Sequence, residues 1–434
     1  MVNNAVMQFA DRAFLARESM ASLEASLPAS MLSFIVLGFF QSVVAYSGTF
    51  VAQYHGAGDA RRAALSYRAG NIIALASGAA ALAFAPLGSF VFDWVGANGE
   101  VLWREKTYYA IVTAGGVFLF LQMAASAYFT GRGMTRLVFA VNLGGNVLNL
   151  AIDPLLIFGW GPIPAFGITG AAAATVASTA VQWAALAYAA RREERRQPGT
   201  VPARELGTVP AGELGRIALR ILRFGIPSGG YAVLNILSFT IFVFVTEKVG
   251  DVAFAVSNAC FSINYLLYAP IEGFAIGAQT LVGQARGRGD DEAAYVAGLR
   301  TTALAAGLVA VLVAAVILAH GPILSIFAPP DSAAAAEFHS LGFTLFLMLG
   351  AWQVFDATDV AISGALKGAG DTRFVFWWML AGAFAFWLPL VFLVAKVHNT
   401  MPALWATMIV FVAVMCAGSL WRWQCGAWRR TKLT

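Results

Sequence analysis

The chain has 434 residues, of which 59% are hydrophobic and only 12% are Asp, Glu, Lys or Arg. Soluble globular domains carry roughly 25% charged residues. The composition therefore argues against a soluble enzyme, a disordered chain and a nucleic-acid-binding protein, and the net charge of +5 does not change this. Four His and three Cys are too few and too scattered to predict a zinc site or a disulfide framework.

Apolar stretches long enough to cross a bilayer, about 20 residues each, recur along the whole chain. Residues 2–15 are too short to span, and Asp11 interrupts them, so they resemble neither a full helix nor a signal peptide. We interpret them as a shortened first helix, which brings the expected number of transmembrane helices to twelve. The other predicted spans are 27–50, 70–95, 107–130, 137–160, 166–190, 221–247, 252–283, 298–327, 337–365, 374–396 and 401–423.

A long polar stretch divides the chain into two halves. We expect an N-terminal lobe of six helices over residues 1–190, a cytoplasmic linker over 191–219, a C-terminal lobe of six helices over 220–423 and a cytoplasmic tail over 424–434. Cytoplasmic segments of membrane proteins are enriched in Lys and Arg, which predicts that both termini are cytoplasmic. With that topology the basic residues on the opposite side are only Arg12, Arg17, Arg104, Lys106, Lys248 and Lys396.

The sequence also repeats itself. VAQYHGAGD at 51–59 resembles VGQARGRGD at 282–290, and GRGMTRLVF at 131–139 resembles GAGDTRFVF at 368–376. Both copies of each motif fall on the predicted cytoplasmic side, so the halves have the same orientation. Parallel repeats of this kind are related by an axis along the membrane normal and are typical of transporters, with the substrate bound between the lobes. The first half lacks residues that the second half has at 220–235, so we expect helix 1 to be truncated.

Ionisable residues deep in predicted membrane helices are costly and indicate function. In this chain they are acids, and no Lys or Arg lies at a comparable predicted depth. A buried carboxyl can hold a proton or bind Na⁺ with neighbouring oxygens, which suits a cation-coupled carrier. The acids are Asp11, Asp153, Glu272, Asp356 and Asp359.

The richest polar cluster is in the predicted fifth helix. Asn142, Asn146, Asn149 and Asp153 are spaced by three or four residues, which places them on one helical face. Such a stripe must face protein or water rather than lipid. The equivalent segment of the second half has no Asn or Asp, so the stripe points to a function of the first lobe that Asp11 could complete. The alternative interpretation is hydrogen bonding between helices.

The second half has a more scattered set of polar residues. Asp356 and Asp359 lie on one face of the predicted tenth helix, and Glu272 in the eighth helix corresponds to Gln41 in the first half. These side chains are candidates for gating or substrate contact, with helix packing as the alternative. Tyr231 could line a cavity for aromatic cations.

These motifs give the chain a family resemblance over essentially its whole length. The segments 51–59, 131–178, 280–290 and 356–373 resemble the multidrug and toxic compound extrusion (MATE) transporters. The resemblance implies twelve helices in two six-helix lobes, and export of organic cations or metabolites in exchange for Na⁺ or H⁺ by alternating access. It implies no cofactor beyond the coupling ion.

The resemblance also assigns site residues. It places cation coupling, with a possible Na⁺ site, at Asp11, Asn149 and Asp153, and it maps the family's helix 10 acid onto Asp356. NorM-like members of the family carry a Glu in helix 7, eight residues after a Pro, where this chain has Asn235. Coupling through the first lobe is therefore the better hypothesis.

The expected function is secondary active efflux of small organic molecules, often cationic, in antiport with H⁺ or Na⁺. The alternative is a related flippase for lipid-linked sugars or lipids, against which the membrane-embedded acids argue. We expect a monomer, not an enzyme and without a nucleic-acid partner, embedded in the lipid bilayer of a bacterial-type cytoplasmic (inner) membrane.

Overall fold

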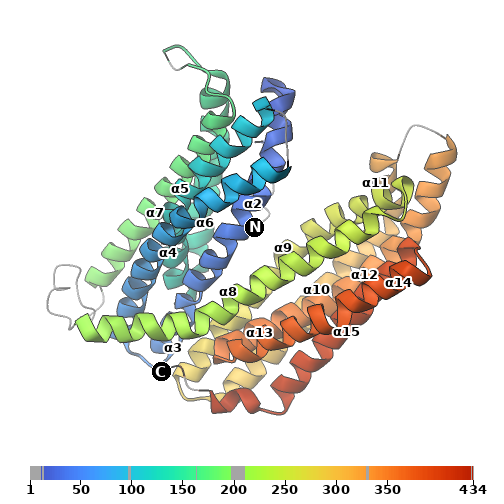
Figure 1. Cartoon of the computed structure of the whole chain (residues 1–434). Coiled ribbons are helices and arrows are strands. Elements are labelled where there is room, and N and C mark those ends of the chain that lie inside the picture. Colours follow the sequence, from blue (N-terminus) through green and yellow to red (C-terminus); the bar gives the residue numbers. More distant parts are fainter. Residues whose placement is uncertain are drawn as a thin grey trace. The chain divides into compact units, whose positions relative to one another are not determined.

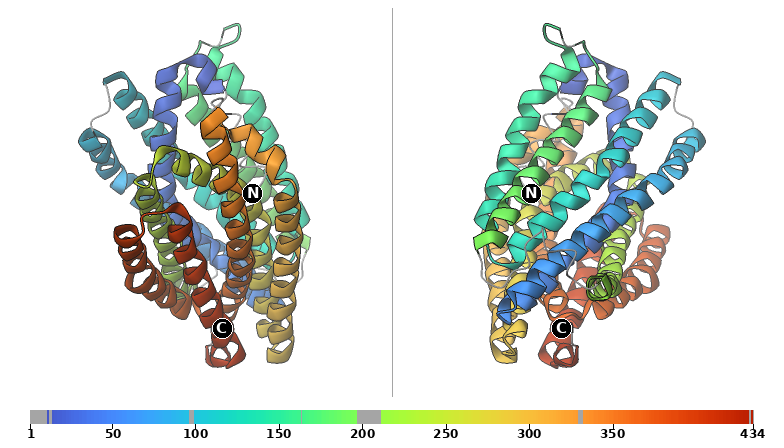
Figure 2. Two further views of the ribbon diagram at one scale, coloured as in Figure 1. Left: turned by 90° about the vertical axis from the view of Figure 1, so that its right-hand side faces the viewer. Right: turned by 90° about the vertical axis from the view of Figure 1, so that its left-hand side faces the viewer.

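The computed structural model describes residues 11, 14–95, 99–162, 164–196, 211–328, 332–431 and 433. These residues fold almost entirely into helices, which form two compact units (Figure 1). The division between the two units falls after Gly229, and the C-terminal unit is Gly230–Leu433. Within each unit, long helices lie beside one another (Figure 2).

In the N-terminal unit, residues 14–18 are helical. Ser19 caps the next helix, because its hydroxyl oxygen accepts a hydrogen bond from the Ser22 backbone N–H at 3.0 Å. The helices are α2 (Met20–Ala45), α3 (Ser47–Gly56), α4 (Ala60–Val95), α5 (Gly99–Gly131), α6 (Thr135–Phe158), α7 (Ile168–Arg196) and the first part of α8 (Ala211–Glu247).

The C-terminal unit continues from the second part of α8. Its core is aromatic: the Trp387 and Phe411 rings stack with centroids 4.5 Å apart, and the Phe261 and Trp405 rings stack at 5.3 Å. The further elements are α9 (Asp251–Gly287), α10 (Asp291–Leu318), α11 (His320–Phe327), α12 (Ser332–Ala369), α13 (Thr372–Leu380), a π-helix (Ala381–Trp387), α14 (Leu388–Val397), α15 (Met401–Gln424) and a 3₁₀ turn (Ala427–Arg430).

Ten helical segments of the described residues are long and apolar enough to cross a membrane. They correspond to all the predicted full-length spans except 166–190, which forms the less apolar helix α7. Residues 1–10 of the predicted first helix and 197–210 of the predicted linker lie outside the described residues. The helix α8 begins at Ala211, so part of the predicted linker 191–219 is helical.

The first repeated motif has the same backbone geometry in both units. Gly58 and Gly289 adopt positive φ angles of 75° and 76°, which glycine tolerates without a steric penalty. Asp59 and Asp290 follow, and each carboxylate accepts a hydrogen bond of 2.8 Å from the backbone N–H three residues further on. The motif is therefore a helix end followed at once by a capped helix start, and its conservation between the halves has a structural reason.

We expect Asp59→Ala and Asp290→Ala each to cost about 1 kcal/mol of stability, because each removes the acceptor at the N-terminus of a helix. Thermal unfolding of the detergent-solubilised protein measures this loss. Asn caps helices about as well as Asp, so Asp59→Asn and Asp290→Asn are the matched controls. Equal losses for the Ala and Asn variants would contradict the capping role.

The second repeated motif brings helices into close contact. A Cβ built on Gly131 would lie 2.6 Å from the Gly48 carbonyl oxygen of α3, and one on Gly368 would lie 2.4 Å from the Gln279 carbonyl oxygen of α9. Real side chains do not approach this closely, so both positions require glycine. The two halves thus share a close helix–helix contact at glycine as well as a turn.

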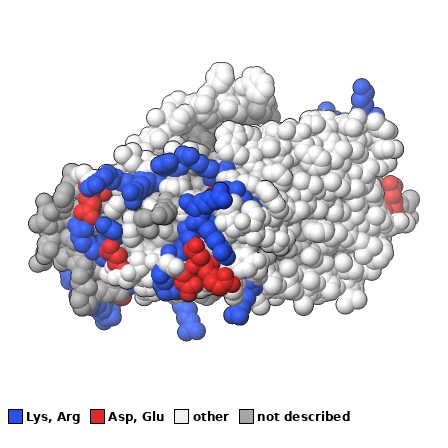
Figure 3. Space-filling model, turned by 90° about the horizontal axis from the view of Figure 1, so that it is seen from below, with Lys and Arg blue, Asp and Glu red and all other residues white. Residues whose placement is uncertain are grey.

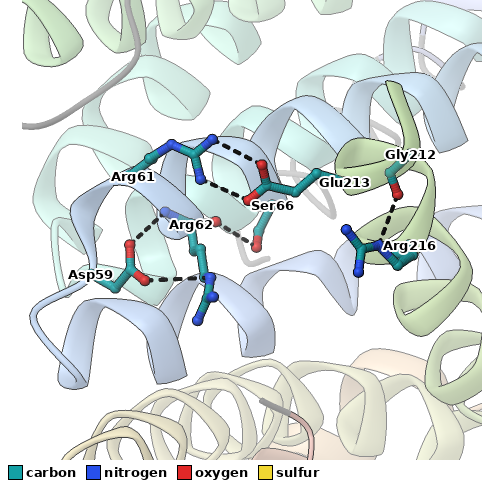
Figure 4. Close-up of polar contacts among 7 residues, drawn as sticks. All are labelled: Asp59, Arg61, Arg62, Ser66, Gly212, Glu213 and Arg216. Atoms are coloured by element: carbon teal, nitrogen blue, oxygen red, sulfur yellow. Dashed lines mark hydrogen bonds and ion pairs between the residues drawn. The ribbon is translucent and has the colours of Figure 1, made fainter. Parts of the chain in front are cut away.

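Basic side chains gather over one part of the surface seen from below in Figure 3. At helix ends in the N-terminal unit, several of them pair with acids. Arg61 of α4 forms a two-pronged ion pair with Glu213 of α8, in which Nη1 and Nη2 donate to Oε1 and Oε2 at 2.7 and 2.8 Å (Figure 4). Arg132 pairs with Glu193 at 3.1 Å. These contacts attach the beginning of α8 and the end of α7 to the rest of the unit.

Candidate functional site

The polar stripe of α6 faces the interior of the N-terminal unit. Asn149 and Asp153 are fully buried and Asn146 is nearly so, while Asn142 is half-buried. On the opposite face, the Val147 side chain is 59% exposed. The helical spacing of the polar residues therefore brings them to one inward face.

Apolar packing holds the helical segment at 14–18 against α6. The Phe14 ring meets the Phe158 ring edge-on at 6.4 Å, and Leu15 is buried in a cluster with Ile157 and Ile168. This packing brings the partly buried Asp11, which lies just before the segment, to the inward face of α6.

Asp153 is the centre of this site. Asn149 Nδ2 donates to Asp153 Oδ1 at 3.4 Å, and the carboxyl groups of Asp153 and Asp11 interact directly. Asn149 Oδ1 is buried and has no hydrogen-bond partner among the described residues. Two carboxylates in contact repel each other unless a proton or a cation lies between them. The arrangement can therefore hold a proton or a small cation with three oxygen-bearing side chains.

Asn142 makes a different kind of contact. Gln122 of α5 donates through Nε2 to Asn142 Oδ1 at 2.9 Å, and the same amide approaches Ser126 Oγ at 3.2 Å. A hydrogen bond between helices thus accounts for Asn142, as the alternative interpretation of the stripe expected. Gln122 is a polar residue that the sequence reasoning did not single out.

A second polar cluster lies in the C-terminal unit. Glu272 of α9, Asp356 and Asp359 of α12 and Tyr231 of α8 interact electrostatically. Asp359, which is 6% exposed, also accepts a hydrogen bond from Ser419 of α15. The structure therefore brings together four residues that were predicted as separate candidates from the sequence.

The acids of the C-terminal unit have a basic partner, although no Lys or Arg was expected at their depth in the membrane. Lys367, near the end of α12, interacts electrostatically with Glu272 and Asp359, and its Nζ lies 3.9 Å from the centroid of the Tyr231 ring. The long apolar stem of a lysine lets its ammonium reach far from its own Cα. Lys367 follows Asp356 by eleven positions and so shares its helical face, a signal that was available in the sequence.

Two further candidates have positions that suggest no role in either cluster. Asn235 is exposed on α8, and its backbone carbonyl accepts a hydrogen bond from Ser238 Oγ at 3.0 Å. Gln41 is half-buried in α2. Within the described part of the chain, no three or more His, Cys, Asp or Glu residues are grouped closely enough to hold a metal ion.

Comparison with known proteins relates the chain to one family of proteins. Residues 1–155 and 227–393 match the family model described as MatE. The chain is 28% identical over 374 residues to the probable multidrug resistance protein NorM of Deinococcus radiodurans, covering 86% of this chain and 78% of the relative. It is 25% identical over 354 residues to the protein of the same name from Agrobacterium fabrum, covering 81% and 74%.

The fold also matches solved structures. An outward-facing multidrug resistance MATE family transporter of the MOP superfamily superposes with a TM-score of 0.85 at 20% identity, covering 99% of this chain and 94% of that one. This similarity confirms the all-helical membrane fold predicted from the sequence.

Proposed function

The chain belongs to the MATE family of multi-pass membrane transporters, and on that premise we propose that it exports organic, often cationic, drugs or metabolites in antiport with H⁺ or Na⁺. Family membership also confirms that the protein is not an enzyme. The names of the relatives, which are probable multidrug resistance proteins, support an exporter of this kind.

The observation that carries the proposal is the contact between Asp11 and Asp153 beside Asn149. In the proposed mechanism a proton or Na⁺ binds to these three side chains. Binding relieves the repulsion between the two carboxylates and draws the segment that carries Asp11 towards α6; release of the ion reverses this. Ion occupancy then biases the N-terminal unit between two arrangements, which is the property that alternating access requires.

We also propose a membrane topology and a location for the protein. The clustering of Lys and Arg at helix ends supports a topology with both termini in the cytoplasm. We place the protein in a bacterial-type cytoplasmic membrane, as a monomer with its duplicated lobes over 1–190 and 220–423, joined by the linker 191–219 and followed by the tail 424–434.

Proteoliposomes loaded with ethidium test this function and identify the coupling ion. We expect ethidium transport to follow an imposed Na⁺ gradient or an imposed pH gradient, and to stop when the matching ionophore collapses that gradient. An ethidium transport rate that is the same with and without either gradient would contradict antiport. Movement of a fluorescent lipid-linked sugar without either gradient would favour the flippase instead.

A further inference from the structure

Lys367 is a basic residue in the last turn of α12, just beyond the predicted span 337–365, and its ammonium interacts with two acids of the C-terminal unit. It lies on α12, two residues before that helix ends at Ala369. Its side chain is half-buried. The proposed coupling of ions at α6 makes no use of it.

The surroundings of the Lys367 ammonium are those of a cation-binding site. Its Nζ lies 3.9 Å from the centroid of the Tyr231 ring, well inside the range for a cation–π interaction. The carboxylates of Glu272 and Asp359, from two different helices, interact with the same ammonium. An aromatic face and carboxylates are also the groups by which proteins recognise organic cations.

Asp359 shows that hydrogen bonds alone do not satisfy this site. Its side chain is nine-tenths buried, and Oδ1 has no hydrogen-bond partner among the described residues. The Ser419 hydroxyl group donates to the carboxylate, but it is neutral. Lys367 supplies a nearby positive charge that compensates the carboxylate when it is ionised.

We propose that Lys367 is a resident cation of the C-terminal unit, and that an organic cation binding at Tyr231, Glu272 and Asp359 must displace its ammonium. Lys367 then sets the selectivity of this site, because a ligand must interact with the aromatic ring and the carboxylates better than a tethered ammonium does. The inference rests on the proposed export of organic cations.

The position of Lys367 makes displacement feasible. Because the residue lies within the last turn of α12, its flexible side chain can swing towards the helix end, where the negative end of the helix dipole also attracts a positive charge. Arg keeps the charge at this position and Gln removes it, so the two substitutions separate charge from packing.

Binding of tetraphenylphosphonium to the purified full-length chain in detergent tests the proposal. We expect Lys367→Gln to bind this cation on the order of tenfold more tightly, because one competing charge is gone. Lys367→Arg should bind like the wild type. Lys396→Gln, which removes an exposed lysine from α14, is the matched control and should also bind like the wild type.

A double variant tests whether the gain in affinity of Lys367→Gln depends on the carboxylates. Adding Glu272→Gln to Lys367→Gln should reverse most of the gain in affinity, since the ligand then loses a carboxylate that the ammonium had masked. A folded Lys367→Gln protein that binds the probe no more tightly than the wild type would overturn the proposal. So would a gain in affinity that is unaffected by Glu272→Gln.

Chemical labelling covers the case in which Lys367→Gln does not fold. In the wild-type chain, saturating tetraphenylphosphonium should speed the acetylation of Lys367, measured by peptide mass spectrometry, because the displaced ammonium moves to the helix end. An unchanged or slower rate refutes displacement. Neither experiment needs an ion gradient, so failure here is distinguishable from failure of antiport in proteoliposomes.

Discussion

The Asp153→Asn variant is expected to reach the membrane in normal amounts and to export no ethidium above the level of cells without the transporter. Asn has nearly the shape of Asp but can neither hold a transferable proton nor carry the negative charge that attracts Na⁺. Asp153 is fully buried and contacts both Asn149 and Asp11. A single substitution therefore removes the central group of the coupling site, and the loss should exceed about tenfold in transport rate.

Stability measurements distinguish this loss of function from misfolding. In the wild type, Asp153 and Asp11 repel each other when both are ionised, and replacing one of them with a neutral amide removes that repulsion. The melting temperature of Asp153→Asn should therefore equal or exceed that of the wild type. A lower melting temperature together with poor expression would indicate a structural role instead.

Asp93→Asn is the matched control for this experiment. It makes the same chemical change near the end of α4, where Asp93 is half-exposed and pairs with Lys106. Exposed ion pairs contribute little to stability, so this variant should export ethidium like the wild type. Wild-type export by Asp153→Asn would show that the site at α6 does not couple transport to an ion.

Two strong signals made most of the fold predictable. Most of the membrane helices are long apolar segments, so hydropathy located them. The duplicated motifs indicated two equivalent halves. The structure gives a reason for the first motif, because Gly58 and Gly289 occupy the same left-handed position before a capped helix. The stripe from Asn142 to Asp153 was visible because polar residues are rare in such helices and their spacing follows the helical period.

What the sequence did not reveal depends on contacts between distant helices. Lys367 is close to the end of its helix, and only the structure shows that its ammonium reaches Tyr231 and Glu272. Asn142 was grouped with Asp153, but its partner is Gln122 on α5. The break between α2 and α3 at Tyr46 also has no proline or glycine at that residue to mark it. Periodicity indicates which face a side chain occupies, but it does not identify the partner on that face.

The Gly364→Leu variant should be the most damaging to stability. Gly364 and Gly368 are four residues apart on α12, the spacing of small residues that lets two membrane helices approach closely. A Cβ on Gly364 would lie 2.3 Å from the Ala275 carbonyl oxygen of α9, and one on Gly368 would lie 2.4 Å from that of Gln279. Both obstacles are backbone atoms, which cannot rotate away as a side chain can.

Leucine at position 364 must therefore push α9 away from α12 along their interface. We expect a cost above about 3 kcal/mol, the upper end of the range for overpacking, together with loss of the monodisperse peak when extracted protein is analysed by size-exclusion chromatography. Gly277→Leu is the control, because a Cβ on Gly277, two residues after Ala275 on α9, has no neighbour within 4 Å. The same separation would move Glu272 away from Asp359, since these residues lie on the two helices that are forced apart. Any Gly364→Leu protein that does fold should consequently lose the effect of Lys367 on cation binding. Equal melting temperatures for Gly364→Leu and Gly277→Leu would contradict the prediction, because they would show that the close approach of the two helices is not needed.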